Sequence, residues 1–233
     1  MRKPKRSAAP SRRMAATLLP SPAFYKESST VPEVRVVLDW DGTVTERDTL
    51  DLLLEEFGDP EIYHRVEAEL GKTMTLNEVI AAEFETVTAP LDEAVPWLVE
   101  NTRIRPGFAE LAREHHPLIV SSGFHETIEP LLEREGVLGD VELRANRVDA
   151  RPDGWVVHFR ASEECGVCQE PCKRADLPAN GRVVYAGDGY SDFCAALAAD
   201  EVFATGSLAE HLEERGVPYH PLTDFHALSA ALQ

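Results

Sequence analysis

The most constraining feature of the chain is a short apolar run that ends in two carboxylates. Residues 34–38 read Val-Arg-Val-Val-Leu, and Asp39-Trp-Asp41-Gly-Thr follows at once. The β-branched, nearly continuous apolar run predicts a strand buried on both faces, as in a parallel sheet. Side chains alternate along a strand, so Asp39 and Asp41 are expected to point to the same side. Two carboxylates that close repel each other, which predicts a bound Mg²⁺ and a carboxylate oxygen free to attack phosphorus.

Helices and strands alternate in the second half of the chain. This alternation predicts an α/β fold with a Rossmann-like, doubly wound parallel sheet. In such a sheet, polar residues that follow the strands gather at one edge. The expected strands are 34–38, 117–121, 182–186 and 201–204, with a pair at 141–148 and 155–159 that turns at 152–154, and the expected helices are 108–115, 127–135 and 192–199.

The segment between the first two expected strands reads as helical. Apolar residues recur there at helical spacing, and one stripe stops at Gly58. A connection of this length is too long for a simple crossover loop. We therefore expect a helical cap over residues 47–103, inserted into a core made of residues 31–46 and 104–233.

Charge is distributed unevenly along the chain. The net charge is −18, yet residues 1–30 carry seven Lys and Arg residues and one Glu. We expect residues 1–30 to be a disordered basic tail, with the true start at either Met1 or Met14. Because Lys and Arg contacts to phosphates dominate nucleic-acid affinity, the acidic remainder argues against a nucleic-acid partner.

Other compositional features concern location. Arg12-Arg13 could begin a twin-arginine export signal, but the apolar stretch that follows is too short for one. No run approaches the roughly 18 apolar residues that a membrane span needs, so no membrane partner is expected. Four cysteines without a signal peptide indicate reduced thiols and a cytoplasmic protein. The oligomeric state is left open.

Four segments carry candidate site residues at expected strand ends. They are Asp39-Trp-Asp41-Gly-Thr, Ser121-Ser-Gly123, Lys173 and Gly187-Asp188-Gly-Tyr-Ser-Asp192. Each residue alone also fits an ordinary strand-end turn or helix cap. Together and in this order they resemble the motifs of the haloacid dehalogenase superfamily, within its subfamily IB of phosphoserine-phosphatase-like enzymes. The resemblance covers residue 34 to the C-terminus and implies a core with a C1-type cap and a Mg²⁺-dependent phosphoric monoester hydrolase.

The resemblance also implies roles for the acidic residues. Asp39 is the expected nucleophile, forming an aspartyl-phosphate, and Asp41 is the expected general acid and base. The expected Mg²⁺ ligands are Asp39, Asp41 through its backbone carbonyl, and Asp188.

The remaining motif residues are expected to hold the phosphate. Ser121, Ser122, Gly123 and Lys173 are placed to donate to its oxygens, and Asp192 to orient Lys173. Ser122 is an alternative to Ser121 as the hydroxyl donor. Lys173 lies 15 residues before Asp188, closer than is usual in the superfamily.

A cysteine-rich segment leads directly into Lys173. Cys165, Cys168 and Cys172 follow the spacing C-x2-C-x3-C, with His158 seven residues upstream of the first. These four residues are candidate ligands of a structural Zn²⁺. The alternative is a set of reduced thiols beneath the loop that aims Lys173. Cys194 is expected in the core.

The cap and the cysteine segment also bear on the substrate. They are similar to those of the phosphatases of 2-hydroxy-3-keto-5-methylthiopentenyl-1-phosphate and of the phosphoethanolamine/phosphocholine phosphatases. The resemblance makes Asp48 a candidate substrate-binding residue. Phosphoserine phosphatases need a cap arginine for the substrate carboxylate, whereas residues 76–84 offer Glu83 and no arginine. Phosphoserine is therefore disfavoured.

The leading hypothesis is a phosphatase of a small phosphorylated metabolite, since a cap that closes over the site excludes large substrates. Two other classes compete with it. A phosphotransferase would differ only in the acceptor that reaches the acyl-phosphate. A non-catalytic regulatory protein held by zinc would not need Asp41.

Overall fold

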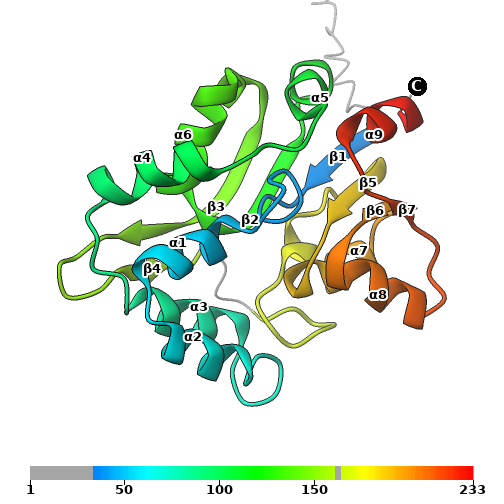
Figure 1. Ribbon diagram of the computed structural model, residues 1–233. Coiled ribbons are helices and arrows are strands. Elements are labelled where there is room, and N and C mark those ends of the chain that lie inside the picture. Colours follow the sequence, from blue (N-terminus) through cyan, green and yellow to red (C-terminus); the bar gives the residue numbers. More distant parts are fainter. Residues whose placement is uncertain (1–33, 161–163, 233) are drawn as a thin grey trace, which may run out of the picture. The chain divides into compact units, whose positions relative to one another are not determined.

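A computed structural model describes residues 34–160 and 164–232, so the expected basic tail lies outside the described residues. Within this part of the chain, seven strands form one sheet in the order β4-β3-β2-β1-β5-β6-β7 (Figure 1). All neighbours pair in parallel except β3 and β4, which are antiparallel. The strands are β1 (Val34–Leu38), β2 (Leu118–Phe124), β3 (Glu142–Asp149), β4 (Val156–His158), β5 (Arg182–Gly187), β6 (Glu201–Ala204) and β7 (His220–Pro221).

Several helices begin at residues whose side chains cap the first amides. Asp48 accepts hydrogen bonds from the first amides of α1, and Thr75 forms a reciprocal capping box with Glu78 at the start of α3. The described helices are α1 (Thr49–Phe57), α2 (Pro60–Glu67), α3 (Leu76–Phe84), α4 (Leu91–Asn101), α5 (Phe108–His115), α6 (His125–Glu135), α7 (Phe193–Ala196), α8 (Gly206–Glu214) and α9 (Phe225–Ala231), with 3₁₀ turns η1 (Leu138–Asp140), η2 (Lys173–Asp176) and η3 (Tyr190–Asp192).

The order of the strands creates one switch point, at β1. From β1 the chain adds β2 and β3 on one side, and later β5, β6 and β7 on the other. The expected doubly wound α/β fold is therefore confirmed. In such sheets ligands bind beyond the carboxyl ends of the strands, where the winding direction reverses. That place lies beyond the ends of β1, β2 and β5.

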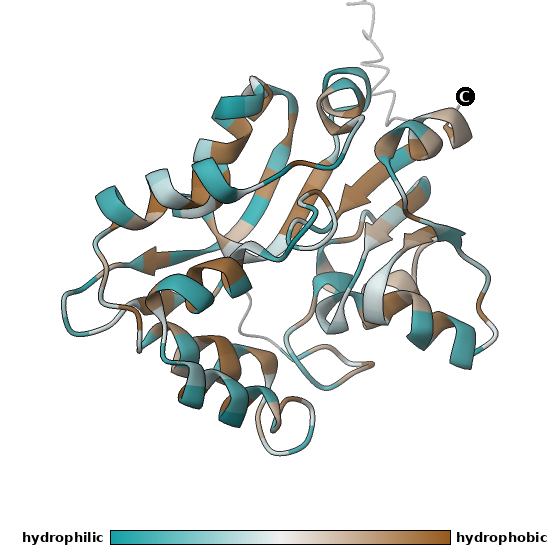
Figure 2. Cartoon of the chain, in the orientation of Figure 1, coloured by the Kyte–Doolittle hydropathy of each residue, from teal (hydrophilic) through white to brown (hydrophobic). Residues whose placement is uncertain are grey.

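Both faces of the sheet are covered by helices. Val36 and Leu38 belong to a large apolar cluster with residues of α1, α3, α4, α5, α6 and α9. Val37, between them, belongs to a second cluster with residues of α7 and α8. This alternation is what a strand buried on both faces requires. Apolar residues accordingly colour the central strands and the inner sides of the helices in Figure 2.

The helices between β1 and β2 have no apolar cluster of their own among the described residues. Phe84 of α3 packs edge-on against Phe124 of β2, with ring centroids 4.8 Å apart, and stacks on Trp155 at 5.8 Å. Arg134 of α6 donates to the carbonyl of Thr102, directly after α4, at 2.9 Å. Residues 34–160 and 164–232 belong to one compact unit by their contacts. None of the described helices has both the length and the apolar character needed to cross a bilayer.

Candidate active site

The residues expected at the strand ends meet at the switch point. Asp39 follows β1 directly, its amide donates to the carbonyl of Ala186 in β5 at 2.9 Å, and the residue is 4% exposed. Lys173, 2% exposed at the start of η2, donates to Asp39 Oδ1 and to Asp192 Oδ1, the latter at 2.8 Å. Three residues far apart in sequence thus form one buried ionic chain.

A tight turn holds Asp39 beside Asp188. The hydroxyl of Thr43 lies 3.3 Å from Asp39 Oδ2 and 3.4 Å from Asp188 Oδ1. Gly42 has a φ of 69°, and a Cβ there would sit 2.2 Å from Asp188 Oδ2, so only glycine fits. Arg105 donates to the carbonyls of Gly42 at 2.9 Å and of Thr43 at 2.8 Å, which fixes the turn from outside.

Asp41 has a different set of partners from Asp39. Its Oδ1 accepts from the amide of Thr49 at 3.1 Å and from the Thr49 hydroxyl, and its Oδ2 accepts from the Ser121 hydroxyl at 3.2 Å. The amide of Gly123 donates to Ser121 Oγ at 2.8 Å. A Cβ on Gly123 would lie 2.8 Å from Asp41 Oδ2, so glycine keeps this approach open.

Asp192 is fully engaged by the protein. Its Oδ1 accepts from the hydroxyl of Tyr185 at 2.6 Å as well as from Lys173, and its Oδ2 accepts from the amides of Asp188 at 3.0 Å and Gly189 at 3.1 Å. A carboxylate held by so many donors orients Lys173 rigidly.

The site holds more negative charge than Lys173 balances. Burial, together with the carboxylate of Asp192, raises the pKa of Asp39 well above its usual range, and Lys173 offsets this only in part. Burial and then Asp192 raise the pKa of Asp188 to about 6. Burial also raises the pKa of Asp41, although the hydrogen bonds from Thr49 oppose the shift.

Lys173 stays charged in this setting. Burial alone would lower its pKa, but the carboxylates of Asp192 and Asp39 outweigh that effect and raise the pKa. The lysine is therefore a fixed positive charge at the switch point.

The excess of carboxylates fits a divalent cation. Oxygens of Asp39, Asp188 and Asp192 all lie within 4.8 Å of one another. Each oxygen of Asp192 already accepts two protein hydrogen bonds, whereas Asp39 Oδ2 and Asp188 Oδ1 receive only the Thr43 hydroxyl at 3.3 and 3.4 Å, so Asp39 and Asp188 are the better candidates to bind a cation. Oxygen donors of this kind suit Mg²⁺, and a cation would relieve the repulsion that raises the pKa values of these carboxyl groups.

A cavity of about 330 Å³ opens beside these residues. Its lining includes Ser121, Ser122 and Lys173, but not Asp39, Asp41 or Asp188. Asn146 of β3 also lines it and donates to the carbonyl of Ser122 at 2.7 Å, which fixes this part of β2. The lining also includes apolar side chains, namely Leu76, Val167, Phe193 and Leu197, and the thiols of Cys168, Cys172 and Cys194.

Two residues discussed from the sequence are outside the lining of this cavity, although burial and then the charge of nearby Asp41 raise the pKa of Asp48. Asp48, the substrate-binding candidate, caps α1, where its Oδ1 accepts from the amides of Leu50 at 2.7 Å and Asp51 at 3.2 Å. It is not part of the cavity lining, and neither is Glu83, which is buried in α3.

Four contacts to the site were not anticipated from the sequence. Thr49 donates to Asp41, and Arg105 donates to the turn at Gly42. Asn146 donates to the carbonyl of Ser122, and Tyr185 donates to Asp192. Thr49 and Tyr185 carry a weak signal, since each is a polar residue within or beside an apolar stripe, where a partner is required.

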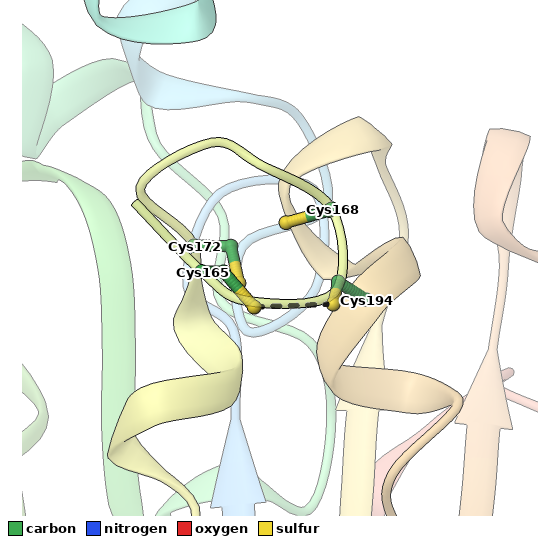
Figure 3. Close-up of side chains that lie close together, drawn as sticks. All are labelled: Cys165, Cys168, Cys172 and Cys194. Carbon is green, nitrogen blue, oxygen red and sulfur yellow. Dashed lines mark hydrogen bonds between the residues drawn. The ribbon is translucent and has the colours of Figure 1, made fainter. Parts of the chain in front are cut away.

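The thiols of Cys165, Cys168, Cys172 and Cys194 come together beside η2 (Figure 3), and we call these four residues the cysteine cluster. The fourth member is Cys194 of α7. His158, which the sequence grouped with the other three cysteines, is not a member and pairs with Arg147 across the β3–β4 ladder.

Comparison with known proteins gives the family. Residues 36–197 match the family described as haloacid dehalogenase-like hydrolase. A 2-hydroxy-3-keto-5-methylthiopentenyl-1-phosphate phosphatase of Bacillus thuringiensis (strain Al Hakam) is 26% identical over 212 residues, which cover 86% of this chain and 96% of that protein. The phosphatase of the same name from Bacillus cereus (strain AH820) matches with the same figures.

Solved structures support the fold. A phospho-aspartyl intermediate analogue of phosphoserine phosphatase superposes with a TM-score of 0.61 at 16% identity, covering 85% of this chain and 97% of that one. Phosphoserine phosphatase from T. onnurineus superposes with a TM-score of 0.56 at 22% identity, covering 76% and 86%. The chain therefore belongs to the haloacid dehalogenase-like hydrolases and is a phosphoric monoester hydrolase among them.

Proposed function

We propose that this enzyme is a Mg²⁺-dependent phosphatase of a small metabolite that works through an aspartyl-phosphate on Asp39. The observation that carries the proposal is the buried chain in which Lys173 bridges Asp39 and Asp192, with Asp188 alongside. Asp39 thus has Lys173 on one side, whose positive charge attracts phosphate, and Asp188 nearby, whose negative charge attracts a cation.

Asp39 is the proposed nucleophile. A carboxylate oxygen of Asp39 attacks phosphorus, and the bond from phosphorus to the leaving alkoxide breaks. Asp41 gives its proton to that alkoxide, a role that suits a carboxyl group whose pKa burial has raised. In the second half-reaction Asp41 takes a proton from water, the water oxygen attacks phosphorus, and phosphate leaves Asp39 in its original form.

The phosphate is held by donors at the end of β2 and by Lys173. The hydroxyl of Ser121 and the amides of Ser122 and Gly123 are proposed to donate to the phosphoryl oxygens, where charge builds in the transition state. For this the Ser121 hydroxyl would turn from Asp41, and the Gly123 amide from Ser121 Oγ, when phosphate binds. Mg²⁺, which would be held by Asp39, Asp188 and the backbone carbonyl of Asp41, supplies further neutralisation of that charge when bound.

Phosphate release from a simple aryl phosphate, with and without Mg²⁺, tests this assignment. Asp39→Asn should abolish turnover, because the amide is no nucleophile. The matched control is Asp224→Asn at the partly exposed N-cap of α9, where asparagine also caps well, and it should keep full turnover. Turnover that survives Asp39→Asn, or that needs no divalent cation, would contradict the proposal.

The cavity supports a substrate with a small, partly apolar leaving group. Apolar side chains line the same cavity as Ser121 and Lys173. Together with the similarity to the Bacillus enzymes, this supports 2-hydroxy-3-keto-5-methylthiopentenyl-1-phosphate as the substrate. Residues 47–103 would form the cap over it, with Leu76 and Asn77 of α3 already in the lining. Four free thiols support a cytoplasmic location.

A second substrate class is favoured by one feature of the same cavity. Glu170, Tyr190 and Phe193 lie in its lining, and the Tyr190 hydroxyl donates to Glu170 Oε1 at 3.2 Å. A carboxylate beside aromatic rings is suited to an alkylammonium group, as in phosphoethanolamine or phosphocholine. Comparing kcat/KM for the enol phosphate and phosphocholine separates the two. Glu170→Gln should lower kcat/KM for phosphocholine alone if the second candidate is right.

A further inference from the structure

The cysteine cluster has the geometry of a second metal site, made of other residues than the carboxylate site, and three of its members line the same cavity as Ser121 and Lys173. Its four sulfurs lie within 4.8 Å of one another, and the Sγ atoms of Cys165 and Cys194 are 3.9 Å apart (Figure 3). Four sulfurs placed tetrahedrally at about 2.3 Å from Zn²⁺ are about 3.8 Å apart. The observed spacing is therefore close to that of a tetrathiolate site.

Packing and disulfide formation do not account for the cluster. Cys194 is buried, but Cys168 is exposed and the other two are only half-buried, so the thiols are not there to fill a core. All four are free, and 3.9 Å is far longer than the S–S bond of about 2.0 Å. A disulfide would in any case use two of them and leave two thiols without a role.

The backbone around the first two cysteines is also shaped for a thiolate. Cys165 and Glu170 close a tight loop, in which the Cys165 amide donates to the Glu170 carbonyl at 2.9 Å and the Gln169 amide to the Cys165 carbonyl at 2.9 Å. The Val167 amide donates to Cys165 Sγ at 3.4 Å. Gln169 has a φ of 63°, a left-handed conformation that costs free energy in any residue but glycine. Binding of a metal by the thiolates would offset the free-energy cost of the Gln169 conformation, and the Val167 amide would stabilise the Cys165 thiolate.

The cluster ties together the two segments that hold Lys173. Cys172 immediately precedes Lys173, and Cys194 comes two residues after Asp192. The Arg174 guanidinium donates to the Cys194 carbonyl at 3.2 Å, which places a positive charge beside the cluster. A metal held by the cluster would fix Lys173 relative to Asp192, whose ion pair is the centre of the buried chain.

We propose that the cysteine cluster binds one structural Zn²⁺ through all four thiolates and that this ion positions Lys173. The ion is distinct from the proposed Mg²⁺, because its ligands are the four thiols and not Asp39 or Asp188. The metal site does not depend on the proposed function, whereas its effect on Lys173 rests on it.

Metal content of the full-length protein, purified under reducing conditions, tests the site. We expect one Zn²⁺ per chain, and after exchange with Co²⁺ the thiolate-to-cobalt charge-transfer absorption of a tetrahedral sulfur site. Cys168→Ser, on the exposed loop, and Cys194→Ser should each lose the zinc. His158→Ala is the matched control and should keep it. These readouts hold whether or not the protein is a phosphatase.

Several outcomes would overturn the zinc site. They are a purified protein with no zinc and no cobalt spectrum, iron in place of zinc, loss of metal in His158→Ala equal to that in Cys194→Ser, or titration that finds two of the four thiols oxidised in the native protein.

Kinetics test the positioning role. Cys168→Ser should lower kcat about tenfold, the usual scale for a disturbed supporting shell, with little change in KM. Cys168→His, which replaces one zinc ligand by another, should restore both zinc content and kcat. A variant that loses zinc but keeps its kcat, or a Cys168→His that regains zinc without regaining kcat, would show that the ion does not position Lys173.

Discussion

At the scale of single residues, the two aspartates after β1 differ in what surrounds them. Asp39 faces a lysine and a second carboxylate, whereas Asp41 receives neutral donors from Thr49 and Ser121. A charged partner favours the ionised form of the nucleophile against the burial that raises its pKa, and neutral donors leave a carboxyl group able to take up and release a proton. The proposed division of work between the two aspartates follows from these partners.

Thr49→Val tests the role of Asp41. The variant removes the hydroxyl donor of Asp41 with little change in shape. The hydrogen bonds from Thr49 lower the pKa of Asp41, so losing one raises that pKa further. Since the first half-reaction needs Asp41 protonated, the alkaline limb of kcat/KM against pH should move upward by about half a unit to one unit.

The matched control for that experiment is Thr127→Val. Thr127 is also buried, but its hydroxyl donates to the carbonyl of Phe124 and touches no carboxylate. Its pH profile should coincide with that of the unmodified enzyme. An alkaline limb that stays in place in Thr49→Val, or moves downward, would mean that Asp41 is not the acid of the first step.

At the scale of elements, α3 carries a buried carboxyl group without a described partner for one oxygen. Glu83 is 5% exposed, and its Oε1 has no hydrogen bond. Burial, together with the charges of Glu67 and Asp51, raises the pKa of Glu83 to about 8. The raised pKa means that the folded protein holds this proton more tightly than the unfolded chain does.

The sign of the effect on stability follows from that difference. Below about pH 4 the side chain of Glu83 is protonated in both the folded and the unfolded state, so its ionisation does not change the free energy of unfolding. As the pH rises toward 8, only the unfolded chain releases the proton, so the free energy of unfolding falls. Glu83→Gln removes this dependence and should gain about 1–3 kcal/mol relative to the unmodified protein between pH 5 and pH 8.5.

Urea denaturation at the two pH values measures this gain. Glu85→Gln is the control, because Glu85 lies two residues further along the chain and is exposed. Its stability relative to the unmodified protein should be the same at both pH values. An equal offset for Glu83→Gln at pH 5 and pH 8.5 would show that Glu83 is ionised in the folded state.

The sequence was most informative about elements whose pattern is local. Both ends of β1, α5 and β6 were predicted correctly, because each is a short run with uniform burial or a clear helical period. The expected helix 192–199 is shorter in the structure, where α7 follows the turn η3. The two-residue strand β7 was missed, since so short a run has no periodicity of its own.

The positions of the motif residues could also be predicted from local patterns in the sequence. Motif residues follow strands, and strand ends in a parallel sheet meet at one edge. Residues that contact the site from outside these motifs have no comparable pattern in the sequence around them. Thr49 and Tyr185 reach the site in this way, and so does Cys194, which joins three cysteines that precede it by 22 residues or more.

At the scale of the whole molecule, α1–α4 and the sheet share one apolar cluster. Trp155, after β3, joins them, because its indole donates to the Ala89 carbonyl at 2.8 Å while its ring packs against Phe84 and Phe124. A cap that folded alone would need an apolar core of its own. Helices α1, α3 and α4 instead place their buried apolar residues in the same cluster as the sheet and α6.

We therefore expect residues 34–232 to unfold in one cooperative step. In calorimetry the measured enthalpy should equal the van't Hoff enthalpy, the mark of a two-state transition. Trp155→Ala should lower the free energy of unfolding by about 3–5 kcal/mol, as for other buried large aromatic residues, and should shift the whole transition. Leu138→Ala, a truncation of an exposed side chain, should leave it nearly unchanged. If α1–α4 were an independent cap, Trp155→Ala would instead split the transition, with helical circular dichroism lost in two steps.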